Sequence, residues 1–243
     1  MSSYAGVLKI LRFNWPWYVS AVLVTAATLG ALLTWTLAEP WATITWALVT
    51  LADTWLLLSL VVSHLIYDRS AVMRGGWLAA GTAAEVAIFH LGQDEASAHV
   101  ARMLPAANRR TFDVFDQNQS GSPSLRRARA LAGQSTTPSA LDQLPLADGS
   151  IDLGLVIFAA HEIRHDATRV AFFRELARII GPAGRVLVVE HLRDGWNLLA
   201  YGPGAFHFLS RRNWLRTFAQ AGLRVAQETS LTPWVRRFEL RRA

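Results

Sequence analysis

Cysteine is absent from the 243 residues, and lysine occurs once, at Lys9. Without cysteine the chain has no disulfide scaffold, no Cys-ligated zinc or iron–sulfur centre and no thiol nucleophile. Charged residues are scarce at 17%, whereas 52% of the residues are hydrophobic, a balance that excludes an intrinsically disordered chain. The net charge of +6 rests on arginine. No nucleic-acid-binding motif accompanies it, so no nucleic-acid partner is expected.

Two long apolar runs lie near the start of the chain. The first extends from Trp15 to Leu37, and the second from Trp41 to about Ile66, interrupted only by Asp53 and His64. At about 1.5 Å per residue the first run reaches roughly 34 Å, which is enough to cross a bilayer core. The connection between them is short, so the two spans form an antiparallel hairpin. The length of the first run, with a second run behind it, argues against a cleaved signal peptide.

The membrane topology follows from the aromatic and basic residues around these runs. Trp15 and Trp41 lie at span ends, where interfacial aromatic belts form. Basic residues occur only on the side away from the connection, at Lys9, Arg12, Arg69 and Arg74. The positive-inside rule therefore predicts a two-pass protein of the bacterial inner membrane with both termini in the cytoplasm. The predicted organisation is a cytoplasmic segment 1–14, a transmembrane hairpin 15–67, a linker 68–84 and a cytoplasmic α/β domain 85–243.

Asp53 lies near the middle of the second run. An ionisable side chain at that depth costs about 2.5–3.5 kcal/mol on insertion scales, so it needs a partner or a neutral state. Thr25 and Thr28 lie at a similar depth in the first run and are candidate hydrogen-bond partners. A neighbouring subunit or a bound polar group is the alternative.

The first run also carries small residues at four-residue spacing, a pattern that lets another helix approach closely. These residues are Ala26, Gly30 and Thr34. We expect the second span, rather than a foreign helix, to pack against Gly30.

From Glu85 onward, short β-rich apolar runs alternate with helical periodicity. The expected strands are 85–91, 111–115, 151–158, 185–190, 223–230 and 235–241. The expected helices are 94–104, with Asp94 as its N-cap, 120–132, 167–180 and 211–221. Strand–helix alternation of this kind predicts a doubly wound α/β sheet.

Two stretches carry a family resemblance. Residues 144–152 (LPLADGSID) and the run FFRELARIIGPAGRVLVVEHLRD resemble the second half of a class I S-adenosylmethionine-dependent methyltransferase domain of type 11. In that family an LPF-D-SFD stretch precedes the fourth strand, and a helix–L-PGG–strand unit forms the fifth. The resemblance covers about residues 85–241. It implies a Rossmann-like sheet of seven strands whose last strand is antiparallel, with a ligand crevice at the carboxyl ends of the strands.

The first half of the domain departs from the family at the cofactor turn. An active member has a D-x-G-x-G turn, in which glycines let the cofactor approach the backbone, but here residues 90–96 (HLGQDEA) hold only Gly92. The candidate S-adenosylmethionine-binding residues implied by the resemblance are Gly92, Asp94, Asp113, Asp116 and His161. For Asp113 and Asp116, a solvated loop pair is the alternative. The turn is bulkier and more acidic than usual, so no cofactor is expected unless the domain is active.

Two further patterns allow other interpretations. His161-Glu162-Ile163-Arg164-His165 matches H-E-x-x-H, the zinc hydrolase signature, with Glu190 or His191 as third ligand. Because the pentad follows a buried strand, we favour crevice-lining residues and expect no metal. The crevice rim is also where His90, His161, His191 and His207 are expected to converge as candidate general bases. The aromatic segment Trp196–Leu209 is a candidate cap, membrane-dipping loop or protein-docking surface.

These features favour a membrane-anchored, catalytically degenerate methyltransferase-like protein. It would serve as an accessory subunit of a bacterial membrane complex, photosynthetic or respiratory, with the bilayer around its hairpin. Protein partners would bind through the hairpin and Trp196–Leu209. The alternative is an active methyltransferase acting on a lipid, quinone or pigment from the membrane.

Overall fold

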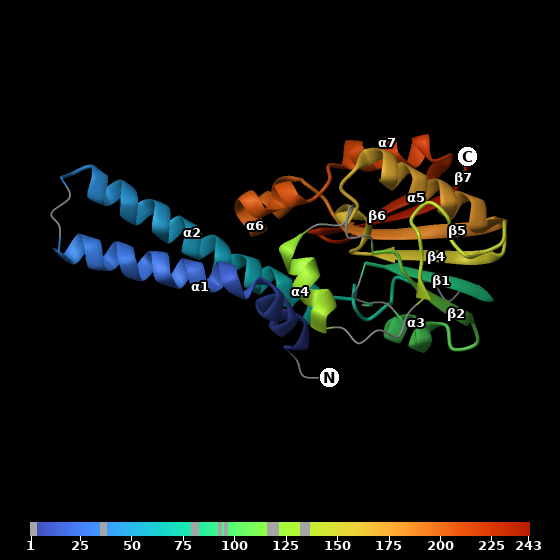
Figure 1. The fold of residues 1–243 in the computed structure, drawn as a ribbon, viewed down its shortest axis with the longest axis horizontal. Helices are drawn as coiled ribbons and strands as arrows, with labels where there is room; N and C mark the ends of the chain where they lie inside the picture. The colour runs from blue at the N-terminus through green and yellow to red at the C-terminus, as the bar shows by residue number, and fades with distance from the viewer. Residues whose placement is uncertain are drawn as a thin grey trace.

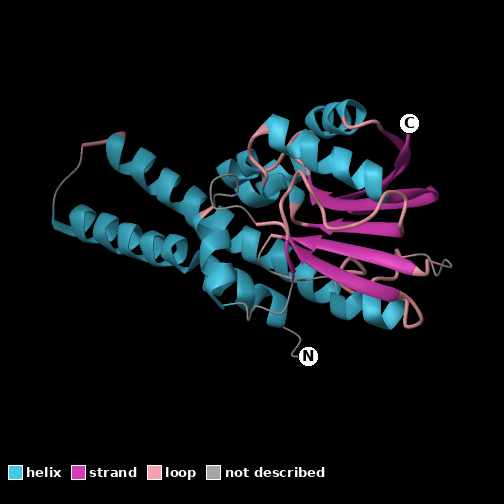
Figure 2. Ribbon diagram, turned by 45° about the vertical axis from the view of Figure 1, so that its right-hand side comes forward, coloured by secondary structure: helices cyan, strands magenta, loops and turns pink. Residues whose placement is uncertain are grey.

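The computed structural model describes residues 4–34, 38–78, 83–91, 94, 97–115, 122–131 and 137–243. A helical hairpin projects from an α/β domain, and helices cover both faces of the sheet (Figure 1, Figure 2). The sheet has seven strands in the order β3-β2-β1-β4-β5-β7-β6. β7 is antiparallel to β5 and β6, and the other neighbours are parallel. The expected Rossmann-like fold with an antiparallel last strand is confirmed.

The hairpin consists of α1 (Ala5–Thr34) and α2 (Trp41–His64), and α2 continues into a π-helical turn, η1 (Leu65–Arg69). Both helices are long and apolar enough to cross a membrane, and the rest of the protein buries neither apolar window. α1 begins well before its apolar run, because Asp68 accepts hydrogen bonds from the backbone N–H groups of Gly6 (2.6 Å) and Val7 (3.0 Å). Much of the segment 1–14 is therefore helical.

Inside the hairpin, one expectation is confirmed and one is wrong. The hydroxyl of Thr25 donates to Oδ2 of Asp53 at 2.8 Å, so Asp53 has the expected partner on α1. Gly30, however, does not contact α2, since a Cβ placed there would meet no neighbouring atom within 4 Å. The physical reason is that α1 and α2 diverge toward the tip (Figure 1, Figure 2). Trp15 and Trp41 are 54% and 64% exposed, as residues facing lipid would be.

The elements of the α/β domain follow the expected alternation. The strands are β1 (Glu85–His90), β2 (Asn108–Asp113), β3 (Thr137–Pro138), β4 (Ile151–Ile157), β5 (Ile180–His191), β6 (Leu223–Thr232) and β7 (Val235–Arg242). The helices are α3 (Ser97–Met103), α4 (Pro123–Leu131), α5 (Asp166–Ile179), α6 (Gly195–Tyr201) and α7 (Arg211–Gln220), with 3₁₀ turns η2 (Ala160–Glu162) and η3 (Gly202–His207). Asp94, the predicted N-cap, accepts a hydrogen bond at its Oδ1 from the backbone N–H of Ser97, the first residue of α3, at 2.8 Å.

Two strands begin earlier than expected. β2 begins at Asn108 rather than Thr111, because Asn108 is already in register with Glu85 of β1. β5 begins at Ile180, which pairs with Ile151, although Gly181-Pro182 predicted a loop there. Two short elements, the strand β3 and the helix α6, were not among the expected strands and helices.

The core has three parts. On one face of the sheet, α5 and α7 pack against Ala87, Phe89, Val186 and Val188; on the other, α3 packs against Val86, Ile88 and Leu155. Alternation of this kind follows from the two-residue period of a strand. A third cluster joins the base of the hairpin to the sheet, through Val62 and Ile66 on one side and Val189, Ala200 and Val235 on the other. The hairpin is therefore anchored at the carboxyl end of β5.

Candidate functional site

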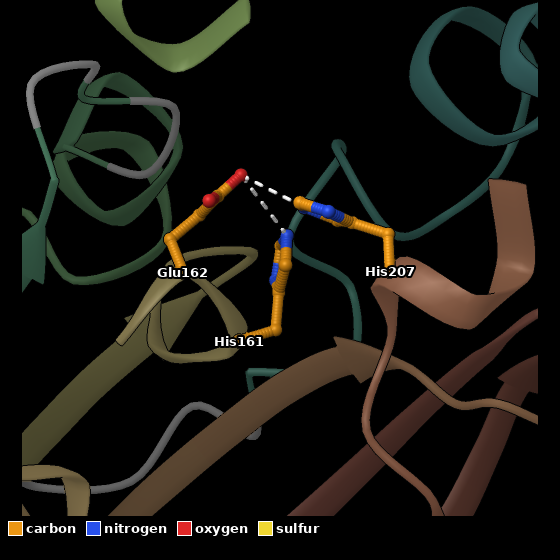
Figure 3. Close-up of side chains that lie close together, drawn as sticks. All are labelled: His161, Glu162 and His207. Atoms are coloured by element: carbon orange, nitrogen blue, oxygen red, sulfur yellow. Dashed lines mark hydrogen bonds and ion pairs between the residues drawn. The ribbon is translucent and has the colours of Figure 1, made fainter. Parts of the chain in front are cut away.

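Four ionisable side chains meet at the carboxyl ends of β4 and β5. His161 and Glu162 lie in η2, directly after β4; Glu190 lies at the end of β5, and His207 ends η3. Figure 3 shows His161, Glu162 and His207 pointing toward one another. His161, Glu162 and Glu190 are buried, with exposed fractions of 8%, 7% and 0%. This edge is where ligands bind in open α/β sheets.

His161 and Glu190 form the inner pair of this group. Nδ1 of His161 donates to Oε2 of Glu190 at 2.7 Å, and its backbone N–H donates to Oε1 at 3.2 Å. The ring is thereby oriented with Nε2 facing Glu162, 3.7 Å from its Oε1. Burial alone would lower the pKa of His161, but the charge and hydrogen bond of Glu190, with the charge of Glu162, outweigh burial and raise that pKa. His161 therefore lies between two carboxylates that favour its protonated form.

Glu162 has one engaged oxygen and one without a hydrogen bond. Its Oε1 accepts from Oγ of Ser122 and from Nε2 of His207, both at 3.0 Å. Its Oε2 is buried and accepts no hydrogen bond from the described residues. Burial would raise the pKa of Glu162, but the hydrogen bond from His207 and the charges of His161, His207 and Arg164 lower it to about 2. Oε2 thus lies 3.9 Å from the guanidinium of Arg164 and is left without a hydrogen bond from the described residues.

His207 is the partly exposed member of the group, with 33% of its side chain accessible. Nη1 of Arg164 donates to the backbone carbonyl of His207 at 2.8 Å, and Nη2 donates to its ring Nδ1. Nη2 of Arg164 also lies 2.8 Å from Nε2 of His207, the ring nitrogen that faces Oε1 of Glu162. His207 therefore lies between the buried carboxylate of Glu162 and the solvent.

Aromatic rings connect the group to the base of the hairpin. Phe208 stacks on His191 with centroids 4.8 Å apart, and meets His161 and Tyr201 edge-on at 5.8 and 5.6 Å. Burial, followed by the charge of His161, lowers the pKa of His191 to about 4, so this ring is neutral. Phe158, which follows β4, has φ of 49° and stacks on His191 at 4.9 Å. A left-handed backbone at a non-glycine residue costs about 1–2 kcal/mol, and such strain clusters at functional sites.

The cofactor candidates fall into separate places. Gly92 and Asp116 lie outside the described residues. Asp94 caps α3, whereas Asp113 is buried at the end of β2, in register with His90 of β1. Burial lowers the pKa of His90 despite the charges of Asp113 and Asp94. Of the four histidines expected to converge, only His161, His191 and His207 are brought together by the contacts described above.

Asp113 is suited to hold the ribose of S-adenosylmethionine. Its Oδ1 accepts from the backbone N–H of Phe115 at 3.1 Å, and its Oδ2 pairs with Arg129 of α4. A carboxylate has about four lone-pair positions, so two contacts leave capacity for ribose hydroxyls. The described residues fit the nucleoside in this respect.

The H-E-x-x-H pattern does not form a zincin site. His165 is exposed and lies just before α5, so His161 and His165 do not share a helix face. His161, Glu162 and His207 do offer ligand atoms within 4.8 Å of one another. These atoms are already engaged in hydrogen bonds and ion pairs, and Arg164 adds a positive charge beside them. Glu190, expected as a third ligand, instead holds His161. That no metal binds stays a prediction.

Comparison with known proteins supports the fold. Residues 97–188 match a family model described as a methyltransferase domain. The mitomycin 7-O-methyltransferase MmcR superposes with a TM-score of 0.53 at 18% identity, covering 100% of this chain and 74% of that one. An O-methyltransferase family 2 protein from Planctomyces limnophilus DSM 3776 gives 0.53 at 14% identity, covering 79% and 62%.

A third solved structure has a similar fold. The geranyl diphosphate C-methyltransferase from Streptomyces coelicolor A3(2) gives a TM-score of 0.51 at 15% identity, covering 76% of this chain and 83% of that one. No match is found among curated proteins. The α/β part therefore has a class I methyltransferase-like fold, preceded by two helices that are apolar enough to span a membrane.

Proposed function

We propose that this methyltransferase-like domain on an apolar hairpin transfers the methyl group of S-adenosylmethionine to a lipophilic acceptor from the bilayer. The observation that carries the proposal is the buried Oε2 of Glu162, which accepts no hydrogen bond from the described residues. Burying a carboxylate is costly unless its lone pairs are satisfied. An acceptor hydroxyl or amine would supply the missing donor.

Each residue of the group has a role in the proposed reaction. When bound, S-adenosylmethionine supplies an electrophilic methyl group, and Asp113 would hold its ribose hydroxyls. Oε2 of Glu162 accepts a hydrogen bond from the hydroxyl or amine that is to be methylated. This bond orients the lone pair of that hydroxyl or amine into the crevice. Glu162 takes up the proton that the acceptor loses as the new bond to the methyl group forms, while His207, bonded to Oε1, holds the carboxylate in place. Glu190 acts through His161, as a positioning residue.

The lipophilic acceptor follows from what surrounds the group. The rings of Phe208 and Tyr201 lie between His161 and the base of the hairpin, and Tyr67 of η1 lies 5.4 Å from Phe158. An aromatic path from the membrane helices favours a lipid, quinone or pigment over a charged metabolite. The basic residues Lys9, Arg12, Arg69 and Arg74 favour a cytoplasmic position for the domain in a bacterial inner membrane.

A second candidate is a degenerate domain that serves as an accessory subunit of a membrane complex. It is favoured by the single glycine in the turn 90–96 and by Arg129, which already neutralises Asp113. The open face at Gly30 is where a helix of another subunit would pack.

Calorimetric titration separates the two candidates. The full chain in lipid nanodiscs is titrated with S-adenosylmethionine, with Asp142→Asn as a surface control. Stoichiometric binding in both proteins supports the methyltransferase. No heat of binding in either protein would overturn it in favour of the accessory subunit.

A further inference from the structure

An apolar surface on α6 and η3 stands apart from the rest of the domain. It consists of Trp196, Leu198, Leu199 and Phe206, which are 58%, 45%, 59% and 65% exposed; we refer to it as the α6 surface. Among the described residues beyond Arg69, no other large hydrophobic side chain is exposed. Large exposed apolar patches mark interaction sites.

The α6 surface is fixed to the second membrane helix. Nε1 of Trp55 donates to the backbone carbonyl of Leu199 at 3.1 Å. Gly202, with φ of +53°, lies so close to the same indole that a Cβ would be 2.8 Å from its Cδ2. Tyr201 is hydrogen-bonded to Ser63, about two helical turns farther along α2. α6 therefore keeps one depth relative to the hairpin (Figure 1).

That depth lies inside a bilayer. From Trp41 to Trp55, at 1.5 Å per residue, α2 advances about 21 Å. A hydrocarbon core is about 30 Å thick. With Trp41 at the far interface, Trp55 and the backbone of Leu199 and Gly202 beside it lie roughly 9 Å short of the near one, within the 5–10 Å to which interfacial helices insert. Ser63, which contacts Tyr201, lies about level with that near interface.

We propose that the α6 surface is inserted among the acyl chains of the leaflet next to the α/β domain. Its continuity with the hairpin argues for lipid as the occupant. So does the charge around it: Arg193 before α6 and Arg212 after η3 are exposed, and such side chains can pair with anionic headgroups. The hairpin and α6 then form one membrane-embedded unit. The inference goes beyond the proposed function and holds whether or not the cofactor binds.

Site-directed spin labelling tests this insertion directly, because the natural chain has no cysteine. Single variants Trp196→Cys and Phe206→Cys are labelled in the full chain. The reference for lipid is Leu23→Cys on α1, and the reference for water is Arg224→Cys on β6. The proteins are placed in vesicles of phosphatidylethanolamine with a minority of phosphatidylglycerol. Collisions of the label with oxygen and with a water-soluble nickel chelate are then measured.

We expect the labels at 196 and 206 to show an oxygen-to-nickel collision ratio several-fold above that at 224, approaching the ratio at 23. Ratios equal to that at 224, with the label at 23 still in lipid, would overturn the proposal. Shielding of 196 and 206 from both reagents in native membranes, but exposure to nickel in the vesicles, would also overturn it, in favour of a protein partner.

Discussion

Nδ1 of His161 lies 2.7 Å from Oε2 of Glu190, and this buried pair joins the carboxyl ends of β4 and β5. The pair keeps the His161 ring turned toward Glu162. It also sets the charge of the whole group, because Glu190 is the main reason that the pKa of the buried His161 is raised rather than lowered. The chemistry proposed for Glu162 and His207 depends on this inner pair.

Replacing Glu190 tests that dependence. We expect Glu190→Gln to lower the pKa of His161, because burial then outweighs the remaining charge of Glu162. Removing one partner of a buried pair lowers the free energy of unfolding by about 3 kcal/mol. Histidine titration by NMR and chemical unfolding measure the two effects. Glu239→Gln, which removes the pair with Arg241 at 3.1 Å, is the control. A His161 pKa that does not move would contradict this account.

Acid should destabilise the domain in two stages. The pKa of His191 is lowered from 6.5 to about 4, so the unfolded chain binds more protons, and stability is lost as the pH falls from about 6.5 to 4. The pKa of Glu162 is lowered from 4.5 to about 2, so its contribution is present above pH 4.5 and is lost toward pH 2. His161 acts in the opposite direction, since its raised pKa gives stability that is lost as the pH rises.

Unfolding of the solubilised full chain, followed by near-ultraviolet circular dichroism across this pH range, measures these stages. His191→Gln should flatten the limb between pH 6.5 and 4. The exposed His165→Gln should leave it unchanged. Equal pH profiles for the two variants would count against a buried, neutral His191.

The fold and part of the site could be predicted from the sequence. Buried runs such as 151–158 and the stop at Gly181-Pro182 indicate strands and a helix end, and their order predicts the sheet. The contacts of Asp94 with the start of α3 and of Thr25 with Asp53 were also predicted, because helix capping and hydrogen bonding in the middle of a membrane span follow from chain position alone.

The rest of the site depends on contacts between distant residues. No local pattern predicts that Ser122 and His207 share one oxygen of Glu162, or that Arg129 pairs with Asp113. The H-E-x-x-H spacing suggested a metal site because it assumes a helix, whereas η2 ends at Glu162. Gly30 was assigned to the wrong neighbour because spacing does not determine how far two helices diverge. The only pointer to Glu190 was its position at the end of a buried strand.

The docking of α6 on the hairpin depends on Gly202. We expect Gly202→Ala to loosen it, because the added methyl group would meet the indole of Trp55 and the backbone has a positive φ. Hydrogen–deuterium exchange of α6 should become faster by several-fold. Gly204→Ala is the matched control, since its Cβ would meet nothing closer than 3.8 Å. Equal exchange in the two variants would show that this contact does not hold α6.

The stability of the association between α1 and α2 should depend on the hydrogen bond between Thr25 and Asp53. Thr25→Val removes the donor and should destabilise helix association by about 0.6–2 kcal/mol, the usual range for such bonds in membranes. Thr54→Val is the control, because the hydroxyl of Thr54 bonds only to its own helix, at the carbonyl of Thr50. Reversible unfolding in mixed micelles compares the two variants. A loss for Thr54→Val as large as that for Thr25→Val would mean that Asp53 has another partner.

Methyl transfer itself is the most direct measurement. The full chain in nanodiscs is incubated with methyl-labelled S-adenosylmethionine and a lipid extract of the membranes from which it is purified. We expect label to enter the organic phase with the natural protein. With Glu162→Gln, transfer should fall at least tenfold while cofactor binding persists. Transfer at the same rate by the two proteins, or none by the natural one although it binds the cofactor, would contradict the role assigned to Glu162.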